Sequence, residues 1–263
     1  MDEPDDRWIA ATAAALLAAE HENVPIEPLT RSRPGLPLET AYRIQAATVA
    51  RHVAAGARVV GYKAGATSKA IQEQAGVDEP DSGVLLDDTV LTTGSTVHRS
   101  VLMQPRVEAE LAFRLGSDLY EPGVTPEEAR AAVKEVFLAL EVIDTRFADW
   151  QITIADSIAD NASCGRVVTG PMVPLDSDLD LADEPLVVSV NGTAVATGEG
   201  RAVLGDPLLV LAWLAGRLRR FGEGLRAGQL VLAGAVHASL PLEAGSTVRA
   251  QSPHLPPVEL RVR

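Results

Sequence analysis

Two glutamates placed two residues apart are the first sign of chemistry in this sequence. Glu108 and Glu110 lie in the segment "RVEAELAF", residues 106–113. The alternating pattern predicts a strand, in which successive side chains point to opposite faces, so the two carboxylates share one face. The opposite face carries Val107, Ala109, Leu111 and Phe113. A strand face with two carboxylates requires either water or a cation.

A third carboxylate favours the cation. Glu141 lies in "VFLALEVID", where nearly every neighbour is apolar, and an unpaired buried carboxylate is strongly destabilising. The structural alternative is an ion pair of Glu141 with Arg106 or Arg146. Three converging carboxylates raise each other's pKa, and a divalent cation removes that conflict. Oxygen-only ligands with positions left for water or substrate indicate Mg²⁺ or Mn²⁺.

Three further side chains are candidates for a site, each with an ordinary alternative. Lys63 lies between Gly61 and Gly65, where the backbone can approach a ligand closely, although a lysine at a strand end is usually solvated. Asp81 lies in a turn rich in Pro, Asp and Gly, where aspartate commonly bonds the local backbone. His237 follows a predicted strand and could line a pocket, although a lone histidine is usually structural.

Helical patterns occur in four places. Residues 5–22 and 38–55 carry apolar side chains at helical spacing, and Gly56 suits the end of the second helix. A shorter helix is predicted at residues 126–134. Residues 207–222 predict a fourth helix, with proline near its start and glycine just past its end.

Most of the remaining sequence from residue 57 onward reads as short strands. Asn191-Gly192, between β-branched runs, predicts a hairpin with a two-residue turn. Three closing strands are predicted in "QLVLAGAV", "STVRAQS" and "PVELRVR". Because strands do not alternate regularly with helices, we expect an α+β fold with a mostly antiparallel or mixed β core. No composition break divides the chain, so we expect a single domain, helical over residues 1–56 and β-rich over residues 57–263.

Composition limits the partners of this protein. The 263 residues include 23 Lys and Arg against 36 Asp and Glu, and the net charge of −13 repels nucleic acid and anionic membranes. Cys164, the single cysteine, excludes an internal disulfide and is predicted to be a buried thiol. The longest apolar run, "PLLVLAWLAG", is too short to span a bilayer. We expect a cytoplasmic protein with a small-molecule ligand, and an anionic ligand then requires a local positive centre.

Five segments, in their order along the chain, resemble one known family. They are "GYKAGATSKAIQEQAGVDEPDSG", "QPRVEAELAF", "ALEVIDTRFADW", "DSIADNASCGR" and "VLGDPLLVLAWLA". Together they are similar to the 2-keto-4-pentenoate hydratase and 4-oxalocrotonate decarboxylase family, within the fumarylacetoacetate hydrolase superfamily. The similarity runs from about residue 25 to the C-terminus. It implies a distorted mixed β-roll core of the fumarylacetoacetate hydrolase type with flanking helices, a homo-oligomer, and a Mg²⁺ or Mn²⁺ site.

The resemblance also implies roles for individual residues. The metal ligands of the family match Glu108, Glu110 and Glu141. The lysine of its "GYK" segment and the aspartate of its "PD-X-G" segment match Lys63 and Asp81, with implied roles in proton transfer and substrate orientation. Ser163, in "NAS", matches a residue of the substrate pocket.

The implied reaction is hydration of a 2-hydroxy-2,4-dienoate to a 4-hydroxy-2-oxo acid in aromatic catabolism. A cation chelated by the substrate stabilises enolate charge and supplies the positive centre. Decarboxylation of a 2-oxo-3-enedioate is the main alternative. Hydrolysis of an acylpyruvate is disfavoured because the N-terminal region has no convincing His-Glu pair to activate water. The intact candidate residues argue against a non-catalytic auxiliary subunit.

Two positions depart from the family pattern. Ser82 stands where the family usually has an aromatic residue, and we expect this change to enlarge the pocket. His237 stands where the family carries small residues, and it introduces a group that can act as acid or base near neutral pH. Both departures concern the substrate more than the metal, and they leave open a bulkier 2-oxo acid from a biosynthetic pathway.

Overall fold

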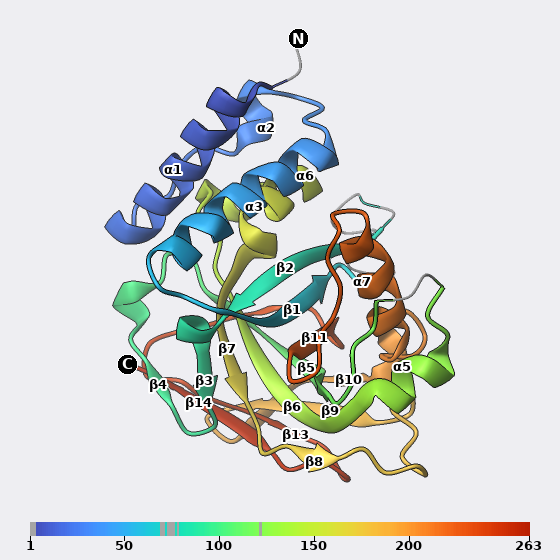
Figure 1. The fold of residues 1–263 in the computed structure, drawn as a ribbon. Coiled ribbons are helices and arrows are strands. Elements are labelled where there is room, and N and C mark those ends of the chain that lie inside the picture. Colours follow the sequence, from blue (N-terminus) through green and yellow to red (C-terminus); the bar gives the residue numbers. More distant parts are fainter. Residues whose placement is uncertain (1–3, 69–71, 73–76, 78, 121–122) are drawn as a thin grey trace.

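A computed structural model of the chain describes residues 4–68, 72, 77, 79–120 and 123–263. The helices form two groups: α1, α2, α3 and α6 lie together at one end of the molecule, and α5 and α7 lie beside the strands (Figure 1). Their bounds are α1 (Asp6–Glu22), α2 (Leu29–Ser32), α3 (Leu38–Ala54), α5 (Pro126–Ala132), α6 (Ile154–Ala159) and α7 (Leu209–Arg219). The four helices predicted from the sequence are confirmed, and the short helices α2 and α6 were not predicted.

Local capping chemistry fixes the ends of several helices. The side chain of Asp5 accepts a hydrogen bond from the Trp8 backbone N–H at the start of α1, and α1 ends at Asn23 in the left-handed conformation. Thr125 and Glu128 form a reciprocal capping box at the start of α5. None of the helices within the described ranges is long and apolar enough to cross a membrane.

The strands form two sheets. The larger sheet has the order β2-β1-β11-β5-β6-β7-β3, with β12 beside β5 and β8 beside β6. Its strands are β1 (Val59–Gly65), β2 (Asp81–Leu86), β3 (Val90–Thr92), β5 (Arg106–Leu115), β6 (Val133–Ile143), β7 (Cys164–Thr169), β8 (Val173–Pro174), β11 (Leu230–Ala235) and β12 (Leu240–Pro241). The smaller sheet, in the order β10-β9-β13-β14-β4, contains β4 (Thr96–Val97), β9 (Pro185–Val190), β10 (Thr193–Glu199), β13 (Thr247–Gln251) and β14 (Val258–Val262).

The sheet topology confirms an α+β fold with a mixed β core. Most neighbouring strands are antiparallel, whereas β1 pairs with β11, β3 with β7 and β4 with β14 in parallel. The predicted hairpin joins β9 to β10, and Asn191 and Gly192 have the positive φ values of 51° and 82° that its turn requires. The three closing strands are β11, β13 and β14, as predicted.

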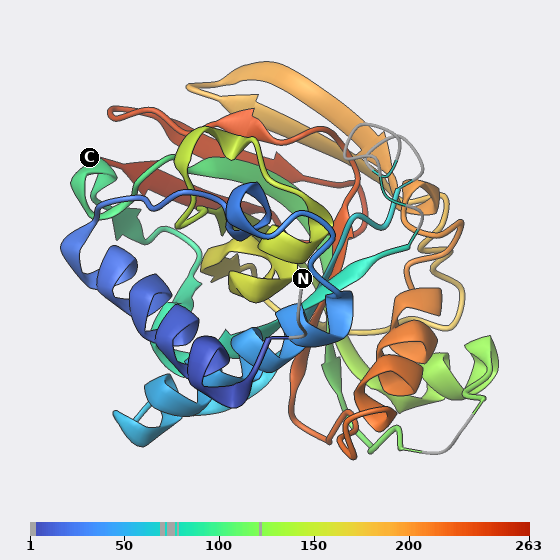
Figure 2. The ribbon, with the colours of Figure 1, turned by 90° about the horizontal axis from the view of Figure 1, so that it is seen from above.

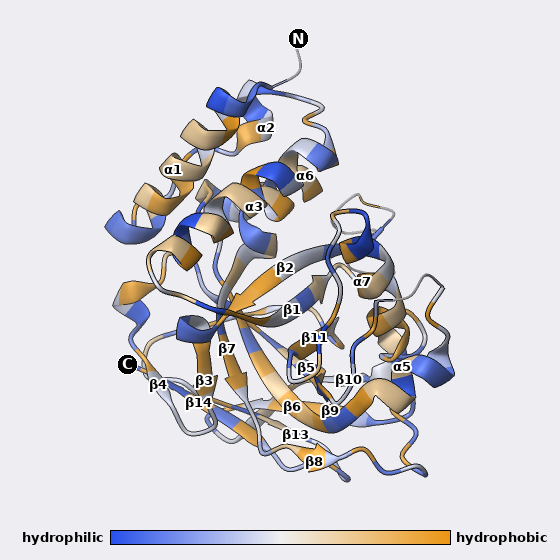
Figure 3. Cartoon of the chain, viewed as in Figure 1, coloured by the Kyte–Doolittle hydropathy of each residue, from blue (hydrophilic) through white to orange (hydrophobic). Residues whose placement is uncertain are grey.

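Two of the three hydrophobic clusters formed by the described residues include helices. The larger cluster joins both sheets to α5 and α7, and it contains Phe113 and Leu138 from the two central strands. The second cluster lies among the N-terminal helices and includes Ile44 and Phe147. Figure 2 shows the N-terminal helices from above, in front of the strands. Figure 3 shows that β6 and β7 are largely hydrophobic, so a carboxylate on either strand lies in an apolar setting.

Candidate metal centre

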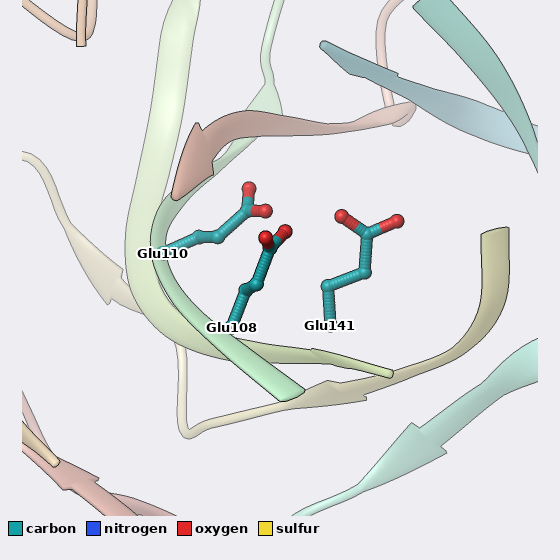
Figure 4. Close-up of side chains that lie close together, drawn as sticks. All are labelled: Glu108, Glu110 and Glu141. Carbon is teal, nitrogen blue, oxygen red and sulfur yellow. The ribbon is translucent and has the colours of Figure 1, made fainter. Parts of the chain in front are cut away.

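The two central strands bring three glutamates together. β5 and β6 pair antiparallel with Glu108 opposite Glu141, and Glu110 follows Glu108 on the same face of β5. One carboxylate oxygen from each of the three glutamates lies within 4.8 Å of the others. Figure 4 shows the three side chains pointing toward a common space from the two strands. The face predicted from the spacing of Glu108 and Glu110 is therefore the face on which Glu141 joins them.

The chain leaves most of this negative charge uncompensated. Glu110 and Glu141 are fully buried, and Glu110 Oε1 and both oxygens of Glu141 accept no hydrogen bond from any described residue. Burial, followed by repulsion from Glu141, raises the pKa of Glu108 to about 7 and that of Glu110 well above its usual range. Buried carboxylates with free oxygens fit a divalent cation, and an oxygen-only donor set suits Mg²⁺ or Mn²⁺.

Neither arginine considered as a partner of Glu141 approaches it. Arg146 forms a buried ion pair with Asp160, and Arg106 donates to Ser239 Oγ and O at 2.6 and 2.7 Å. The nearest cation is Lys63 on β1, whose Nζ lies 3.1 Å from Glu141 Oε1. The structural alternative of an arginine pair is therefore wrong.

Lys63 is buried, contrary to the ordinary expectation for a lysine at a strand end. Its Nζ donates to the Ala162 carbonyl oxygen at 2.8 Å. Burial alone would lower the pKa of Lys63, but the carboxylates of Glu141 and Asp81 outweigh it and raise that pKa, so the ammonium form is favoured. The cation offsets part of the carboxylate charge of the metal centre.

Asp81 begins β2 beside the same space and is also buried. Its Oδ2 accepts a hydrogen bond from Ser157 Oγ on α6 at 2.7 Å, whereas Oδ1 is without a hydrogen-bond partner within the described ranges. Gly65 lies opposite Asp81, and a Cβ on it would come within 2.2 Å of Asp81 Oδ1. Gly61 has a different role, because a Cβ there would meet the Leu230 backbone of the neighbouring strand at 2.0 Å.

A left-handed turn between α6 and β7 carries Ser163. Asn161, Ala162 and Ser163 have φ values of 54°, 52° and 54°, a conformation that non-glycine residues adopt at a cost. The Asn161 side chain clamps the turn, since it accepts from Val84 N at 2.7 Å and donates to Val84 O at 2.9 Å. The turn aims the Ala162 carbonyl at Lys63 and leaves buried Ser163 Oγ without a hydrogen-bond partner among the described residues.

The side chain of His237 is bound to the backbone rather than directed into the space between the glutamates. Its Nε2 accepts from the Ala109 backbone N–H at 3.0 Å, and its Nδ1 lies 2.7 Å from the Ala238 carbonyl oxygen. Burial lowers the pKa of His237, which favours the neutral ring. These contacts differ from the free imidazole expected of an acid or base.

Ser82 does not enlarge the pocket, so that expectation is wrong. Side chains alternate along β2, and the neighbouring Asp81 lines the cavity together with Glu108, whereas Ser82 does not. Ser82 Oγ instead lies 3.3 Å from the Tyr42 hydroxyl, in a separate cavity of about 40 Å³. Arg217 stacks over the Tyr42 ring at 3.8 Å from its centre and lines this cavity.

Cys164 is buried as predicted, and burial raises the pKa of its thiol to about 12.

A cavity of about 380 Å³ opens from the metal centre. Polar residues that line it include Lys63, Asp81, Arg106, Glu108, Ser157, Ser163 and Ser239. Its apolar wall includes Val77, Ile143, Trp150, Ile152 and Ile154. The cavity thus combines a carboxylate cluster and buried proton-carrying groups with room for a small organic molecule.

Several residues of this site carry no short-range signal in the sequence. Ser157 and Asn161 act on Asp81 and Val84 from more than 70 positions away along the chain. Trp150 lines the cavity with a positive φ of 52°, and its ring N–H donates to the Gln104 carbonyl oxygen. The motif "ADNAS" marks the position of the turn, but only the tertiary structure shows the clamp.

Comparison with known proteins agrees with the fold. The profile of the fumarylacetoacetate (FAA) hydrolase C-terminal family matches residues 48–263. The chain belongs to the fumarylacetoacetate hydrolase family. The family resemblance and fold expected from the sequence are thereby confirmed.

Relatives within the fumarylacetoacetate hydrolase family include named hydratases. A 2-keto-4-pentenoate hydratase of Paraburkholderia xenovorans is 43% identical over 89% of this chain and 87% of its own length. A 2-hydroxyhexa-2,4-dienoate hydratase of Comamonas testosteroni is 39% identical over 92% of each chain. The structure of 4-oxalocrotonate decarboxylase from Pseudomonas putida G7, complexed with magnesium and adipate, matches with a TM-score of 0.95, 32% identity and 99% coverage of both chains. A second structure of that decarboxylase contains calcium and acetate.

Proposed function

We propose that this protein is a Mg²⁺- or Mn²⁺-dependent hydratase that converts a 2-hydroxy-2,4-dienoate into a 4-hydroxy-2-oxo acid. The observation that carries this proposal is the cluster of Glu108, Glu110 and Glu141. Glu108 lines the cavity beside Lys63, and the buried oxygens of Glu110 and Glu141 include three that accept no hydrogen bond from the described residues. The named hydratases that are 43% and 39% identical to this chain support the reaction type.

The three glutamates would hold the cation at the inner end of the cavity. The positive charge of a cation held there would stabilise the negative charge that develops on the C2 oxygen of the substrate. Ser163 Oγ, which is buried and free of a hydrogen-bond partner within the described ranges, is placed to donate to a substrate oxygen. The apolar wall of the cavity would hold the hydrocarbon end of the substrate and exclude water from it.

Lys63 and Asp81 are the residues proposed to assist conversion of the dienol into the ketone. The substrate 2-hydroxyl loses its proton and C5 gains one, which converts the dienol into a 2-oxo-3-enoate. Water then adds its oxygen to C4 and a proton to C3. Asp81 lines the cavity and its Oδ1 has no hydrogen-bond partner among the described residues, so Asp81 is the better candidate to move a proton at carbon. Lys63 is placed to orient and stabilise the anionic oxygen. His237 is not included, because both ring nitrogens are engaged by the backbone.

The test is the ultraviolet absorbance decay of 2-hydroxypenta-2,4-dienoate, with product identification by mass spectrometry. We expect decay with Mg²⁺ or Mn²⁺, none with chelator, and a product heavier by one water. Glu108→Gln and Glu141→Gln should abolish metal-dependent turnover. Glu135→Gln is the matched control, because Glu135 lies on the same strand as Glu141 but pairs with Arg114. Near-normal turnover in both active-site variants would contradict the assignment.

Decarboxylation of a 2-oxo-3-enedioate is the second candidate, and Arg106 is the observation that favours it. Arg106 pairs with Ile143 two residues along the strands from the Glu108–Glu141 pair and lines the same cavity, so the cavity has a cation near the metal centre. Such a position suits the second carboxylate of a dicarboxylate substrate. The test is incubation with 2-oxohex-3-enedioate followed by mass spectrometry of the product. A product lighter by CO₂, rather than heavier by one water, would favour decarboxylation.

We also propose a cytoplasmic homo-oligomer and a single cooperative domain. The helical region is tied to the β core by a bridge between Ile26 and Phe147 and by two hydrogen bonds from Gln45 Nε2 to the carbonyl oxygens of Ser82 and Ile158. We therefore expect residues 1–56 and 57–263 to unfold in one transition. Analytical ultracentrifugation measures the number of chains in the assembly, and a monomer would contradict the homo-oligomer. Two separate transitions in scanning calorimetry would contradict the single domain.

A further inference from the structure

The segment over residues 234–239, which contains the end of β11 and the loop after it, contacts strand β5 at three points around the metal centre. The backbone N–H of Gly234 donates to Glu110 Oε2 at 2.7 Å. The His237 ring accepts from the Ala109 N–H. Arg106 donates to Ser239 at the outer end of the same strand. Ala109 stands between two of the three glutamates, so its backbone position governs where both of their side chains begin.

The hydrogen-bond ladder between β5 and its neighbours is interrupted at Ala109. Strand β11 pairs with β5 as far as Ala235 opposite Glu110, and β12 resumes the pairing with Leu240 opposite Val107. Between these points the Val236 N–H donates to the Ala109 carbonyl oxygen at 3.3 Å. The matching acceptor for the Ala109 N–H is the His237 ring, since the chain has turned away from β5.

The contacts of the ring fix its tautomer. Nδ1 lies 2.7 Å from the Ala238 carbonyl oxygen, which can only accept, so Nδ1 carries the proton and Nε2 offers its lone pair. The neutral ring thus replaces a strand carbonyl at this position. A buried backbone N–H that loses its partner is destabilising. At Ala109 this loss would disturb the part of β5 that carries Glu108 and Glu110.

We propose that His237 is a positioning residue of the metal centre, which holds β5 through the Ala109 N–H so that Glu108 and Glu110 converge. This inference rests on the metal site of the proposed function. Groups that orient metal ligands commonly change metal affinity by about 10- to 100-fold when they are removed. The required chemistry is a hydrogen-bond acceptor at the position of Nε2, and proton transfer by the ring is not required.

Two variants of similar side-chain length test the acceptor. His237→Gln can present Oε1 near the position of Nε2, whereas His237→Met fills the space without an equivalent acceptor. We expect calorimetric titration with MgCl₂ and MnCl₂ to give affinity within about threefold of wild type for Gln and about tenfold weaker for Met. His21→Ala, on α1, is the control for loss of a histidine elsewhere. Equal affinities for Gln, Met and wild type would overturn the proposal.

A second measurement requires no metal and no turnover. Hydrogen exchange at the Ala109 amide in metal-free protein should be slow in wild type and His237→Gln, and at least tenfold faster in His237→Met. Unchanged exchange in His237→Met would overturn the proposal. This test remains available if the variants are too unstable for calorimetric titration at high metal concentration. If the wild-type protein bound no metal, the proposed function would be contradicted. The exchange measurement would still test whether His237 holds the Ala109 N–H.

Turnover at saturating metal separates positioning from acid–base catalysis. We expect kcat of His237→Met to recover to within about fivefold of wild type once metal saturates, with the shape of the pH profile retained. Loss of one limb of the pH profile together with wild-type metal affinity would overturn the proposal, because that result assigns His237 to proton transfer.

Discussion

Two groups of buried carboxylates in this protein differ in how the chain neutralises them. Asp160 is surrounded by donors: Thr145 Oγ1 and the Arg146 backbone N–H each donate to it at 2.9 Å, and the Arg146 guanidinium completes an ion pair. Glu110 and Glu141 are equally buried, but Glu110 Oε1 and both oxygens of Glu141 accept no hydrogen bond from the residues the structure describes. The cation beside them is Lys63, whose Nζ lies 3.1 Å from Glu141 Oε1. The first group is complete within the chain, and the second is completed by a bound cation in the proposed function.

The contrast separates structural charge from functional charge. A buried ion pair with all its hydrogen bonds made contributes to a defined fold, and breaking it exposes an uncompensated charge. A buried carboxylate without such partners destabilises the fold until a ligand arrives, and sites of this kind are typical of active centres. Substitutions should therefore act in opposite ways on the two groups.

The largest expected effect is on metal binding by Glu110→Gln. The substitution keeps the shape of the side chain and removes one of the three carboxylates that would hold the cation, so metal affinity should fall by more than about 100-fold. The thermal midpoint of the metal-free protein should stay the same or rise, because like-charge repulsion is relieved. Titration calorimetry with Mn²⁺ and scanning calorimetry with chelator check both effects. A large loss of metal-free stability would place Glu110 in the structural class with Asp160.

The opposite pattern is expected for Asp160→Asn. Removing this charge leaves buried Arg146 without its partner, so the free energy of unfolding should fall by about 3–5 kcal/mol. Urea unfolding of metal-free protein measures this change. Metal affinity of the folded fraction should match wild type, because Asp160 is not among the clustered glutamates. Weakened metal binding with little loss of stability would reverse the comparison.

The sequence predicted the glutamates because their signal is local. A period of two placed Glu108 and Glu110 on one face, and an apolar run identified Glu141 as buried. The family resemblance supplied Lys63 and Asp81, which lie on strands that meet the site only through the sheet order β2-β1-β11-β5. That order depends on long-range pairing, which no window of the sequence contains.

Tertiary geometry determines the contacts of Ser82, His237 and Asn161, which the sequence did not predict. Ser82 was expected in the pocket, but neighbouring residues of a strand point to opposite faces, and its hydroxyl contacts the Tyr42 hydroxyl instead. The acceptor role of His237 arises from a break in strand pairing, and the clamp by Asn161 arises from a turn with three positive φ values. Both depend on tertiary geometry rather than on residue type.

An intermediate effect is expected from pH, through Glu108. In metal-free protein, burial and Glu141 raise the Glu108 pKa from 4.5 to about 7. A raised carboxyl pKa contributes stability at low pH that is lost as pH rises from about 4.5 through 7. Metal binding requires the charged form, so affinity should rise over the same range, by up to tenfold per pH unit below about 7 for one proton. Titrations at pH 5.5 to 8 measure this slope, and a flat profile would contradict the raised pKa.

The smallest effect is expected for the pair of His52 and Glu20, which is partly exposed to solvent. His52 Nε2 lies 3.4 Å from Glu20 Oε2, and the two side chains are 25% and 42% exposed. The hydrogen bond to Glu20 raises the His52 pKa and lowers that of Glu20, so the pair contributes stability above the Glu20 pKa and loses it as pH rises through the His52 pKa. Because solvent screens the pair, Glu20→Gln should reduce the free energy of unfolding by less than about 1 kcal/mol at pH 6 and by nothing measurable at pH 9. Urea unfolding at both values checks this, and a larger loss at pH 9 would show that Glu20 acts through packing rather than charge.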